Sequence, residues 1–515
     1  IVSNAGFEAS VIVEKVRINP GNYVDRKNFR KIDFTEQEYG EEIDKIREGI
    51  SPLLKICNEY GTAIRIGVNH GSLSDRILSR YGDTPLGMVE SALEFIRICE
   101  ELYFKNLVLS IKASNIKVMI EANRLLVHRM MKEEMSYPLH IGVTEAGAGN
   151  DGRIKSAAGI GPLLEDGIGD TIRVSLTEEP EAEIPVAKTL IERYKAKTTG
   201  FTIPEIPVSP INPFEYYVRH SSEVLNTGKN NEKIVVVANA DTSDSNTDYT
   251  FSNDQTLLKS SADKAFITSS ANWSKHFGSV YPLIKAADYF ASKTKSAEAN
   301  FILTRAEELT TEFIEKIKCD STAILVFESE HLRSAIDIRS MFFILLNAHC
   351  KTPVIFKRSY SGITEEEFRI FAASDASLLI TDGLSDGLWL EAEGAESGIV
   401  EKTSFDILQA TGARITKTEF ISCPTCGRTS FNIFETLKRV KQFTGHLKGL
   451  KIAIMGCVVN GPGEMADANY GYVGCTDGKI NLYKGRELVK RNISESDALD
   501  ELINLIKENG DWIEE

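Results

Sequence analysis

Three cysteines and one glutamate stand in two short turns near the C-terminal end of the sequence. Cys423-Pro-Thr-Cys426 is the first turn, and Cys457 is joined to Glu464 by a segment that contains Asn460-Gly-Pro-Gly463. Thiolates are soft ligands that bind zinc or iron–sulfur clusters. Structural zinc sites mostly use four cysteine or histidine ligands, so a carboxylate is an unusual fourth ligand there. The set therefore favours a cluster in which one ligand position is weakly held and open to a substrate.

A structural zinc knuckle is the alternative for these turns. Cys475 or His446 would then complete the set that the three cysteines begin. Glycines beside the cysteines suit a cluster, because they allow backbone N–H groups to approach the sulfurs. The other cysteines stand singly in apolar or helical contexts and are interpreted as buried free thiols: Cys57, Cys99, Cys319 and Cys350.

Cations recur at one register along strands predicted in the first 180 residues. These strands alternate with helical stretches, which predicts a parallel sheet with helical crossovers. Side chains two apart on a strand share a face, and in a (β/α)8 barrel the C-terminal strand ends build the active site. The polar residues placed on that face are Arg17, Asn19, Arg65, Asn69, Ser110, Lys112, Arg173 and Ser175.

Four cations at one depth repel one another unless an anion lies between them. Arginine is suited to bidentate contacts with phosphate, so the pattern predicts a phosphate or carboxylate ligand. Thr144 and Glu145 end another strand, and the single acid could relay a proton or hold a hydroxyl. Ion pairing with nearby acids is the structural alternative for any one of the cations. His70 is interpreted equally well as a ligand contact or as a loop cap.

The chain is predicted to have three domains. Residues 1–185 form the partial barrel, and residues 186–398 form a second βα-rich, barrel-like domain. Residues 399–515 form a small α+β domain that holds the cysteine turns. Prolines punctuate residues 181–232, where little regular structure is expected. Asp166-Gly-Ile-Gly-Asp170 is echoed by Asp382-Gly-Leu-Ser-Asp386, which indicates a degenerate repeat unless the match is due to chance.

Composition excludes some classes of protein. The 515 residues carry a formal charge of −15, which argues against a general nucleic-acid surface. The longest apolar run, around Met341–Leu346, is too short to span a bilayer. Eight cysteines in so long a chain are too sparse for a disulfide scaffold. These observations predict a protein of the cytoplasm that binds neither nucleic acid nor membrane.

Several segments resemble the 4-hydroxy-3-methylbut-2-enyl diphosphate synthase family of the non-mevalonate isoprenoid pathway. CPTCGR at 423–428 and MGCVVNGPGEMADANYGYVG at 455–474 are similar to its iron–sulfur domain. KVRINPGN at 15–22, RIGVNHGSL at 65–73 and GVTEAG at 142–147 resemble its TIM-type barrel. The long middle domain looks like the insertion of the three-domain form, in which it acts as a spacer. The family's first three barrel strands have no counterpart in this sequence, so the barrel is expected to be incomplete.

The resemblance implies a reaction and a set of roles. The family reductively opens the ring of 2-C-methyl-D-erythritol 2,4-cyclodiphosphate, with electrons from ferredoxin or flavodoxin. By motif, Cys423, Cys426, Cys457 and Glu464 would hold a [4Fe–4S] cluster, and substrate would displace Glu464. Glu145 would transfer a proton or hold the C3 hydroxyl. Substrate-binding roles would fall to Arg17, Asn19, Arg65, Asn69, His70, Ser110, Lys112, Thr144, Arg173, Ser175 and Asn460.

Two other functions stay open at this point. One is a cluster-dependent hydro-lyase that acts on a phosphorylated substrate without net electron transfer. The other is a phosphate-binding barrel with a structural zinc site. The three-domain form implies an active site that a monomer can complete, and a homodimer is an open alternative.

Overall fold

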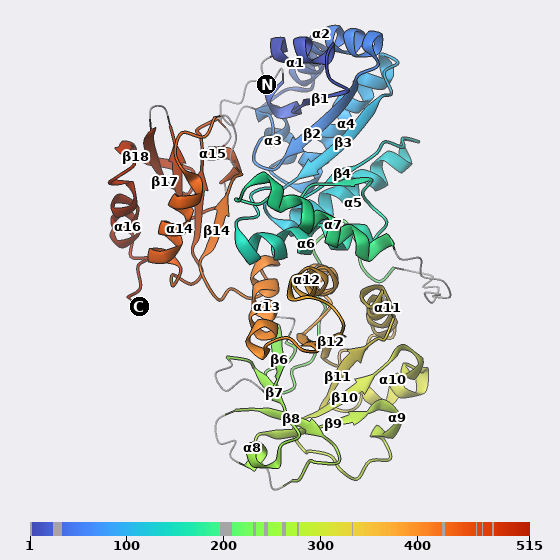
Figure 1. Cartoon of the computed structure of the whole chain (residues 1–515). Helices are drawn as coiled ribbons and strands as arrows, with labels where there is room; N and C mark the ends of the chain where they lie inside the picture. The colour runs from blue at the N-terminus through green and yellow to red at the C-terminus, as the bar shows by residue number, and fades with distance from the viewer. Residues whose placement is uncertain are drawn as a thin grey trace. The chain divides into compact units, whose positions relative to one another are not determined.

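The computed structural model of the chain describes most of its residues. The described ranges are 3–23, 33–195, 209–229, 233–240, 246–259, 264–275, 278–331, 333–424, 428–459, 461–465, 467–475 and 478–514. They form two compact units (Figure 1). The first unit joins Ile1–Ala187 to Lys417–Glu515, and the second is Lys188–Thr416. Among the described residues, no helix combines the length and apolar composition that crossing a bilayer requires.

The N-terminal part of the first unit is built from parallel strands with helical crossovers. β1 (Lys15–Ile18), β2 (Ala63–Asn69) and β3 (Leu107–Lys112) form one sheet, and β4 (His140–Ile141) pairs with β5 (Thr171–Ile172). A parallel bridge between Leu109 and Leu139 connects the two sheets. The predicted alternation of strands and helices is confirmed. The helices are α1 (Ser3–Ser10), α2 (Glu36–Tyr60), α3 (Asp75–Tyr81), α4 (Pro85–Glu101), α5 (Ile116–Lys132), α6 (Gly149–Glu165) and α7 (Glu183–Lys195).

Helix α7 lies in a segment for which the sequence predicted little regular structure, and that prediction is wrong here. Pro185 is the third residue of the helix. Proline is tolerated in the first turn, because the N–H groups there have no partner within the helix. The proline therefore lies in the first turn of a helix rather than in a loop.

The second unit contains a closed barrel of eight parallel strands. This confirms the barrel-like middle domain. The strands are β6 (Val235–Asn239), β7 (Tyr249–Phe251), β8 (Phe266–Ser269), β9 (Val280–Lys285), β10 (Asn300–Thr304), β11 (Ala323–Glu328), β12 (Val354–Tyr360) and β13 (Gly387–Ala392). The helices are α8 (Gln255–Lys259), α9 (Ala286–Tyr289), α10 (Thr311–Ile317), α11 (Ser334–Asn347), α12 (Glu365–Thr381) and α13 (Ser397–Ala410). Its core is made of inward-facing apolar residues such as Phe301, Val326 and Trp389.

Three strands of this barrel were misjudged from sequence. The apolar run Ala376–Ile380 predicts a strand, but it lies inside α12, and the strand is β13, which begins eleven residues after Ala376. Short apolar runs suit a buried helix and a buried strand equally well. β9 contains Pro282, which removes a donor from the ladder and weakens the strand signal. The polar composition of Asp241–Asp254 predicts an exposed loop, but this segment contains β7, which is only three residues long.

The two Asp-Gly-x-x-Asp segments occupy equivalent positions. Asp166 and Asp382 each follow the last residue of a helix, α6 and α12, and each pairs with an arginine of the preceding helix, at 2.7 Å to Arg124 and 2.8 Å to Arg339. The second aspartate of each segment accepts a backbone N–H at the start of the preceding strand. Asp170 binds the N–H of Leu139 at 2.7 Å, and Asp386 binds that of Val354 at 2.8 Å. The echo in the sequence therefore marks a structural repeat.

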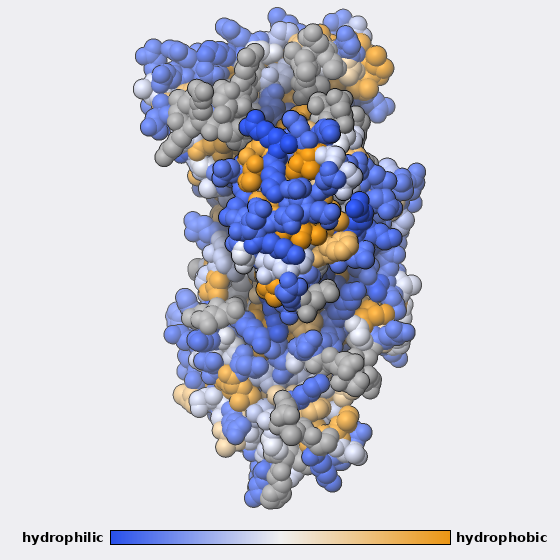
Figure 2. All heavy atoms as spheres, turned by 90° about the vertical axis from the view of Figure 1, so that its left-hand side faces the viewer, coloured by the Kyte–Doolittle hydropathy of each residue, from blue (hydrophilic) through white to orange (hydrophobic). Residues whose placement is uncertain are grey.

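The C-terminal domain is a five-stranded mixed sheet with helices on one face. Its order is β14 (Glu419–Ser422), β15 (Lys451–Met455), β16 (Tyr470–Gly474), β17 (Lys479–Lys484) and β18 (Glu487–Ser494). α14 (Ile433–Thr444) and α16 (Ala498–Glu508) pack on one core, and α15 (Gly461–Glu464) follows the second cysteine turn. The side of β18 and α16 is mostly hydrophilic (Figure 2). Charged side chains on edge strand β18 discourage pairing with another chain.

Candidate active site

The four predicted cations lie close enough to repel one another; Lys112 ends β3 and Arg173 directly follows β5, whereas Arg65 is the third residue of β2. Arg17 and Arg65 are direct neighbours across β1 and β2, and Asn69 is the neighbour of Lys112 across β2 and β3. Burial and repulsion from neighbouring cations lower the pKa of three of these side chains. Burial, with Arg65 and Arg173, lowers the pKa of Arg17 to about 10. Burial and Arg173 also lower the pKa of Arg65.

Lys112 is buried and is repelled by the other three cations. Burial, followed by repulsion from Arg173, Arg65 and Arg17, lowers the pKa of Lys112 well below its usual range. Within the described part of the chain, the Nζ of Lys112 and the Nε of Arg65 are buried without a hydrogen-bond partner. Such groups cost free energy unless a ligand satisfies them. The site is therefore prepared for an anion.

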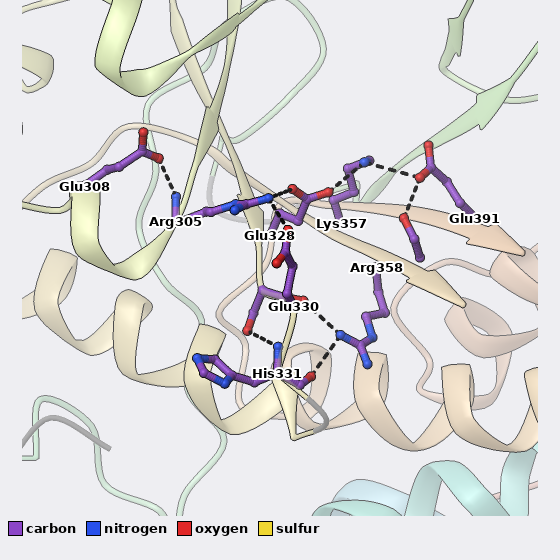
Figure 3. A network of polar contacts seen from close by, with 10 residues as sticks. Arg305, Glu308, Glu328, Glu330, His331, Lys357, Arg358 and Glu391 are labelled. Carbon is purple, nitrogen blue, oxygen red and sulfur yellow. Dashed lines mark hydrogen bonds and ion pairs between the residues drawn. The ribbon is translucent and has the colours of Figure 1, made fainter. Parts of the chain in front are cut away.

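The mouth of the second barrel has a different electrostatic character. There the corresponding cations are paired with acids on neighbouring strands (Figure 3). Lys357 lies 2.8 Å from Glu328 and 3.2 Å from Glu391, and Arg305 lies 2.5 Å from Glu330. Arg358 donates to the backbone carbonyls of Ser329 and His331. The described charges compensate one another, so this mouth lacks the excess positive charge of the first.

Glu145 lies in the loop between β4 and α6, in the left-handed region with φ 51°. Residues held in such conformations cluster at functional sites. Burial and the charge of Glu464 raise the pKa of Glu145 to about 8, while a hydrogen bond to Thr144 opposes the shift. The carboxyl group is therefore mostly protonated near neutral pH and can donate a proton.

Glu464 reaches the same site from the C-terminal domain. Burial raises its pKa, whereas a hydrogen bond to Asn69 and the charges of Arg17 and Arg173 oppose the shift. A Cβ atom on Gly71 would lie 2.1 Å from the carbonyl oxygen of Gly463. Only glycine fits such an approach, and its φ of 75° is also unfavourable for other residues. The α15 turn is thus packed directly on the barrel loop that follows β2.

The cysteine turns lie beside these acids. Glu145, Glu464 and Cys457 each raise the pKa of the Cys423 thiol, after burial as the main cause. The backbone N–H of Gly456 donates to the Cys423 sulfur at 3.2 Å. Cys426 and Asn460 lie outside the described residues. Cys423, Cys457 and Glu464 thus lie near one another, but the described residues contain no group of three histidine, cysteine or acidic side chains that could hold a metal ion.

The surroundings of Cys423 suit a thiolate ligand of an iron–sulfur cluster. The N–H group at Gly456 stabilises a thiolate, which a buried thiol cannot form alone. A Cβ on Gly456 would lie 2.8 Å from the hydroxyl oxygen of Thr429, and one on Gly474 would lie 2.6 Å from the carbonyl of Gly456. These glycines bring the backbone close to the cysteine turns, as the sequence predicted. Cys475 donates to the carbonyl of Lys479 within its own hairpin.

Some of the predicted residues have structural partners. Asn19 caps the short turn Pro20–Asn22 and donates to the Ser72 hydroxyl at 3.0 Å. The Nε2 of His70 lies 3.3 Å from Asp83, which favours the loop interpretation of this histidine. Ser110, Thr144 and Ser175 are buried, and Ser175 accepts from Arg173 at 3.4 Å. Cys57, Cys99 and Cys350 are buried as predicted, but Cys319 is exposed at the end of α10.

Sequence reasoning missed the residues that join the barrel to the C-terminal domain. Gly71 was not singled out, nor was Arg428, whose charge opposes the upward pKa shift of Glu464. Thr177 and Ser422 form a buried contact that no motif suggested. Gly71 and Arg428 stand in the recognised segments RIGVNHGSL and CPTCGR and could have been found there. The other contacts depend on tertiary structure.

Family models match both ends of the chain. Residues 3–188 match the GcpE TIM-barrel domain, and residues 419–508 match the GcpE protein C-terminal domain. The chain is also similar to curated proteins over almost its whole length. It is 48% identical over 507 residues to a 4-hydroxy-3-methylbut-2-en-1-yl diphosphate synthase (flavodoxin) of Parabacteroides distasonis. That alignment covers 97% of this chain and 83% of the relative.

Two further relatives carry the same name. One, from Bacteroides fragilis, is 47% identical, with 98% of this chain and 82% of the relative covered. Another, from Protochlamydia amoebophila, is 42% identical, again with 98% and 82% covered. The fold and site define a barrel enzyme with an iron–sulfur domain, and the chain belongs to the GcpE family.

Proposed function

We propose that this protein reductively opens the ring of 2-C-methyl-D-erythritol 2,4-cyclodiphosphate to give 4-hydroxy-3-methylbut-2-enyl diphosphate. Two electrons and two protons enter, a ring C–O bond breaks and the C3 hydroxyl leaves as water. One observation carries the proposal: clustered cations, of which Lys112 Nζ and Arg65 Nε have no hydrogen-bond partner among the described residues, lie close to the cysteine–glutamate turns. The charges of Arg17 and Arg173 oppose the rise in the pKa of Glu464, and, after burial, the charge of Glu145 raises the pKa of Cys423. The names of the relatives support the same reaction.

The cations are assigned to the diphosphate group. Arg17 and Arg65 offer guanidinium donors, and Lys112 offers a buried ammonium group that lacks a partner in the described structure. A diphosphate would satisfy these donors and remove their mutual repulsion. Arg173, Asn69, Ser110, Thr144 and Ser175 are proposed to complete the binding site. Asn19 and His70 are assigned to holding the loops around it, because both already have protein partners.

Glu145 is proposed as the proton donor to the leaving hydroxyl. A hydroxyl group leaves more readily as water, so the protonated form of this acid is the useful one. Burial and the neighbouring carboxylate of Glu464 both favour that form. The hydrogen bond from Thr144 orients the carboxyl group. The carboxylate of Glu464 thus favours the protonated, neutral form of Glu145.

A [4Fe–4S] cluster is proposed on Cys423, Cys426, Cys457 and Glu464, and when bound it would supply the electrons. Glu464 is held by Asn69 and by nearby arginines rather than by the cysteine turns alone. These partners can stabilise its carboxylate when it leaves the ligand position. Asn460 is proposed to approach the substrate from the same turn. The relatives are named as flavodoxin enzymes, which supports a flavodoxin as electron donor.

The other organisational proposals follow from the family. The chain would consist of domains 1–185, 186–398 and 399–515, with the middle domain as a spacer. A monomer would then complete the active site in the cytoplasm. The compensated charges at the mouth of the second barrel support a structural rather than a catalytic role for that barrel.

Anaerobic purification followed by metal analysis and turnover tests the proposal. The protein should be brown, contain iron and sulfide, and convert the cyclic diphosphate only when reduced flavodoxin or a chemical reductant is present. Colourless protein with one equivalent of zinc would exclude the cluster. Turnover without reductant would favour the hydro-lyase, in which the substrate loses water without gaining electrons.

A further inference from the structure

The loop that carries Glu145 runs beside the strand that leads to Cys423. Ala146 and Ser422 form a parallel β-bridge between the barrel and the C-terminal domain. Ala146 directly follows Glu145, and Ser422 directly precedes Cys423. The proposed acid and the first proposed cluster ligand are therefore each one residue from the same backbone contact.

A buried pair of hydroxyl groups reinforces this bridge. The Oγ1 of Thr177 lies 2.6 Å from the Oγ of Ser422 and donates to the Ser422 carbonyl at 3.1 Å. The backbone N–H of Thr177 donates to the carbonyl of Gly147 at 2.9 Å. Thr177 is 3% exposed and Ser422 is fully buried. Thr177 therefore binds the Glu145 loop with its backbone and the Cys423 strand with its side chain.

Ion pairs flank the hydroxyl pair. Lys155 on α6 lies 3.0 Å from Glu419 at the start of β14, and both side chains are largely buried. Asp151, at the start of α6, lies 2.6 Å from Lys417 and 3.2 Å from Lys441. These contacts hold α6 and β14 together at the end of β14 that is farther from Cys423. The hydroxyl pair lies at the end of β14 that is nearer to Cys423.

We propose that Thr177 and Ser422 are positioning residues, whose hydroxyl pair holds the strand ending at Cys423 in register with the loop that carries Glu145. The inference rests on the proposed function, since it concerns the distance between the proton donor and the site of reduction. Neither residue contacts the substrate or the cluster in this role. A small misplacement of a reacting group lowers the reaction rate more than the substrate affinity, because the transition state tolerates less deviation in geometry than the bound substrate does.

The predicted signature is a split between kcat and KM. The substrate is proposed to bind mainly to the barrel cations, which Thr177→Val leaves in place. Because these contacts are the same in the ground state and the transition state, KM should change by less than about twofold. Loss of one buried hydrogen bond corresponds to about a tenfold loss in kcat. Thr177→Ser keeps the hydroxyl group and should restore most of the rate.

The experiment compares Thr177→Val, Ser422→Ala and Thr177→Ser with the matched control Thr444→Val. Thr444 is also fully buried, but its hydroxyl donates to Val440 within α14. Each variant is reconstituted anaerobically and assayed with a chemical reductant, so that flavodoxin docking plays no part. Iron and sulfide content, the change that substrate causes in the electron paramagnetic resonance spectrum, and hydrogen exchange of residues 144–150 and 419–424 are measured in parallel.

Thr177→Val should keep the wild-type iron content, lose about tenfold in kcat, show a smaller spectral change with substrate, and exchange hydrogen faster in both segments. Wild-type kcat and exchange in Thr177→Val would overturn the inference, and so would a rate loss that Thr177→Ser fails to restore. A rate loss that follows the iron content, or that Thr444→Val shares, would also overturn it. If the wild-type protein itself binds no cluster, the proposed function fails, and unchanged exchange in Thr177→Val would then reject the contact separately.

Discussion

After burial, the carboxylate of Glu464 is the main cause that raises the pKa of Glu145, although one residue belongs to the C-terminal domain and the other to the barrel. Two carboxylates so close do not both ionise readily in a buried site. Burial raises the pKa of Glu464 as well, and the charges of Arg17 and Arg173 oppose that rise. The arrangement assigns different roles to two acids that the sequence places more than 300 residues apart.

Glu145→Gln should lower kcat by about 10² to 10⁴, the range for loss of general acid catalysis. Glutamine has nearly the same shape and can still donate a hydrogen bond, but it cannot transfer a proton. Substrate binding should therefore persist. Steady-state assays with a chemical reductant measure the effect, and Glu179→Gln in an exposed turn serves as the control. Wild-type turnover by Glu145→Gln would remove this residue from the proton-transfer role.

Lys112→Met should weaken substrate binding and stabilise the unliganded protein. The variant removes a buried cation that lacks a partner in the described structure, and such a charge destabilises the fold. It also removes a charge-assisted contact worth about 1.5–3 kcal/mol, so KM should rise by about tenfold to a hundredfold. Thermal unfolding and steady-state kinetics give the two results.

Lys357→Met is the matched control for Lys112→Met, because it removes a lysine from the mouth of the second barrel. Lys357 separates Glu328 from Glu391, so its loss leaves two carboxylates in mutual repulsion. This variant should lose stability and keep the wild-type KM. A rise in KM for Lys357→Met, or its absence for Lys112→Met, would contradict the assignment of the anion site to the first barrel.

Substrate binding should take up protons, because the pKa of Lys112 is lowered in the free protein. A diphosphate beside the amine favours the charged form and raises this pKa again. Between the lowered and the restored pKa, the complex holds more protons than the free protein. Affinity should therefore fall as pH rises through this window. Calorimetric titration in two buffers of different ionisation enthalpy measures the uptake, which Lys112→Met should reduce.

Cluster content should depend on Cys423 and Cys457 but not on Cys475. Cys423→Ser and Cys457→Ser should lose the cluster, whereas Cys475→Ser should retain it, since that thiol donates within its own hairpin. Glu464→Ala should keep much of the cluster, with altered oxygen sensitivity and low activity. Iron and sulfide analysis of anaerobic preparations decides among these outcomes. Full iron content in Cys457→Ser would contradict the ligand assignment.

Much of this site follows from local patterns. The spacing of Arg65 and Asn69 along one strand is a period-two pattern, and the register with β3 confirms that Asn69 and Lys112 are neighbours. The cysteine turns and Glu464 were visible because glycine and proline fix the backbone around them. Such features depend on a few adjacent residues, so the sequence alone predicts them well.

Contacts between distant segments are different. The bridge between Ala146 and Ser422 and the approach of Gly71 to Gly463 join segments far apart in the chain. Neither segment predicts such a contact by itself, because the contact depends on the shape of both partner segments. β9 shows a related limit, since the strand has neighbours on both sides although it contains Pro282, which is paired only with Thr268. Pairing within the closed barrel therefore stabilises a strand that the proline disfavours locally.

The repeated Asp-Gly-x-x-Asp segments give a last prediction, because their second aspartates differ in burial. Asp386 is fully buried with Arg219, at 2.7 Å, and also accepts from Val354. Asp386→Ala would leave a buried guanidinium group without its partner, which costs about 3–5 kcal/mol. Asp170 is exposed and binds the N–H of Leu139, so Asp170→Ala should cost only about 1 kcal/mol.

Urea unfolding of the whole chain, followed by tryptophan fluorescence, compares the two variants. Trp273 and Trp389 lie in the second unit, which contains Asp386, and Trp512 lies in the first unit, which contains Asp170. Asp386→Asn keeps the size of the side chain and serves if the alanine variant fails to fold. Replacing Arg219 and Asp386 together by Met and Leu should recover part of the lost stability, since it removes both buried charges. Equal losses for Asp170→Ala and Asp386→Ala would show that burial does not set the cost at these equivalent positions.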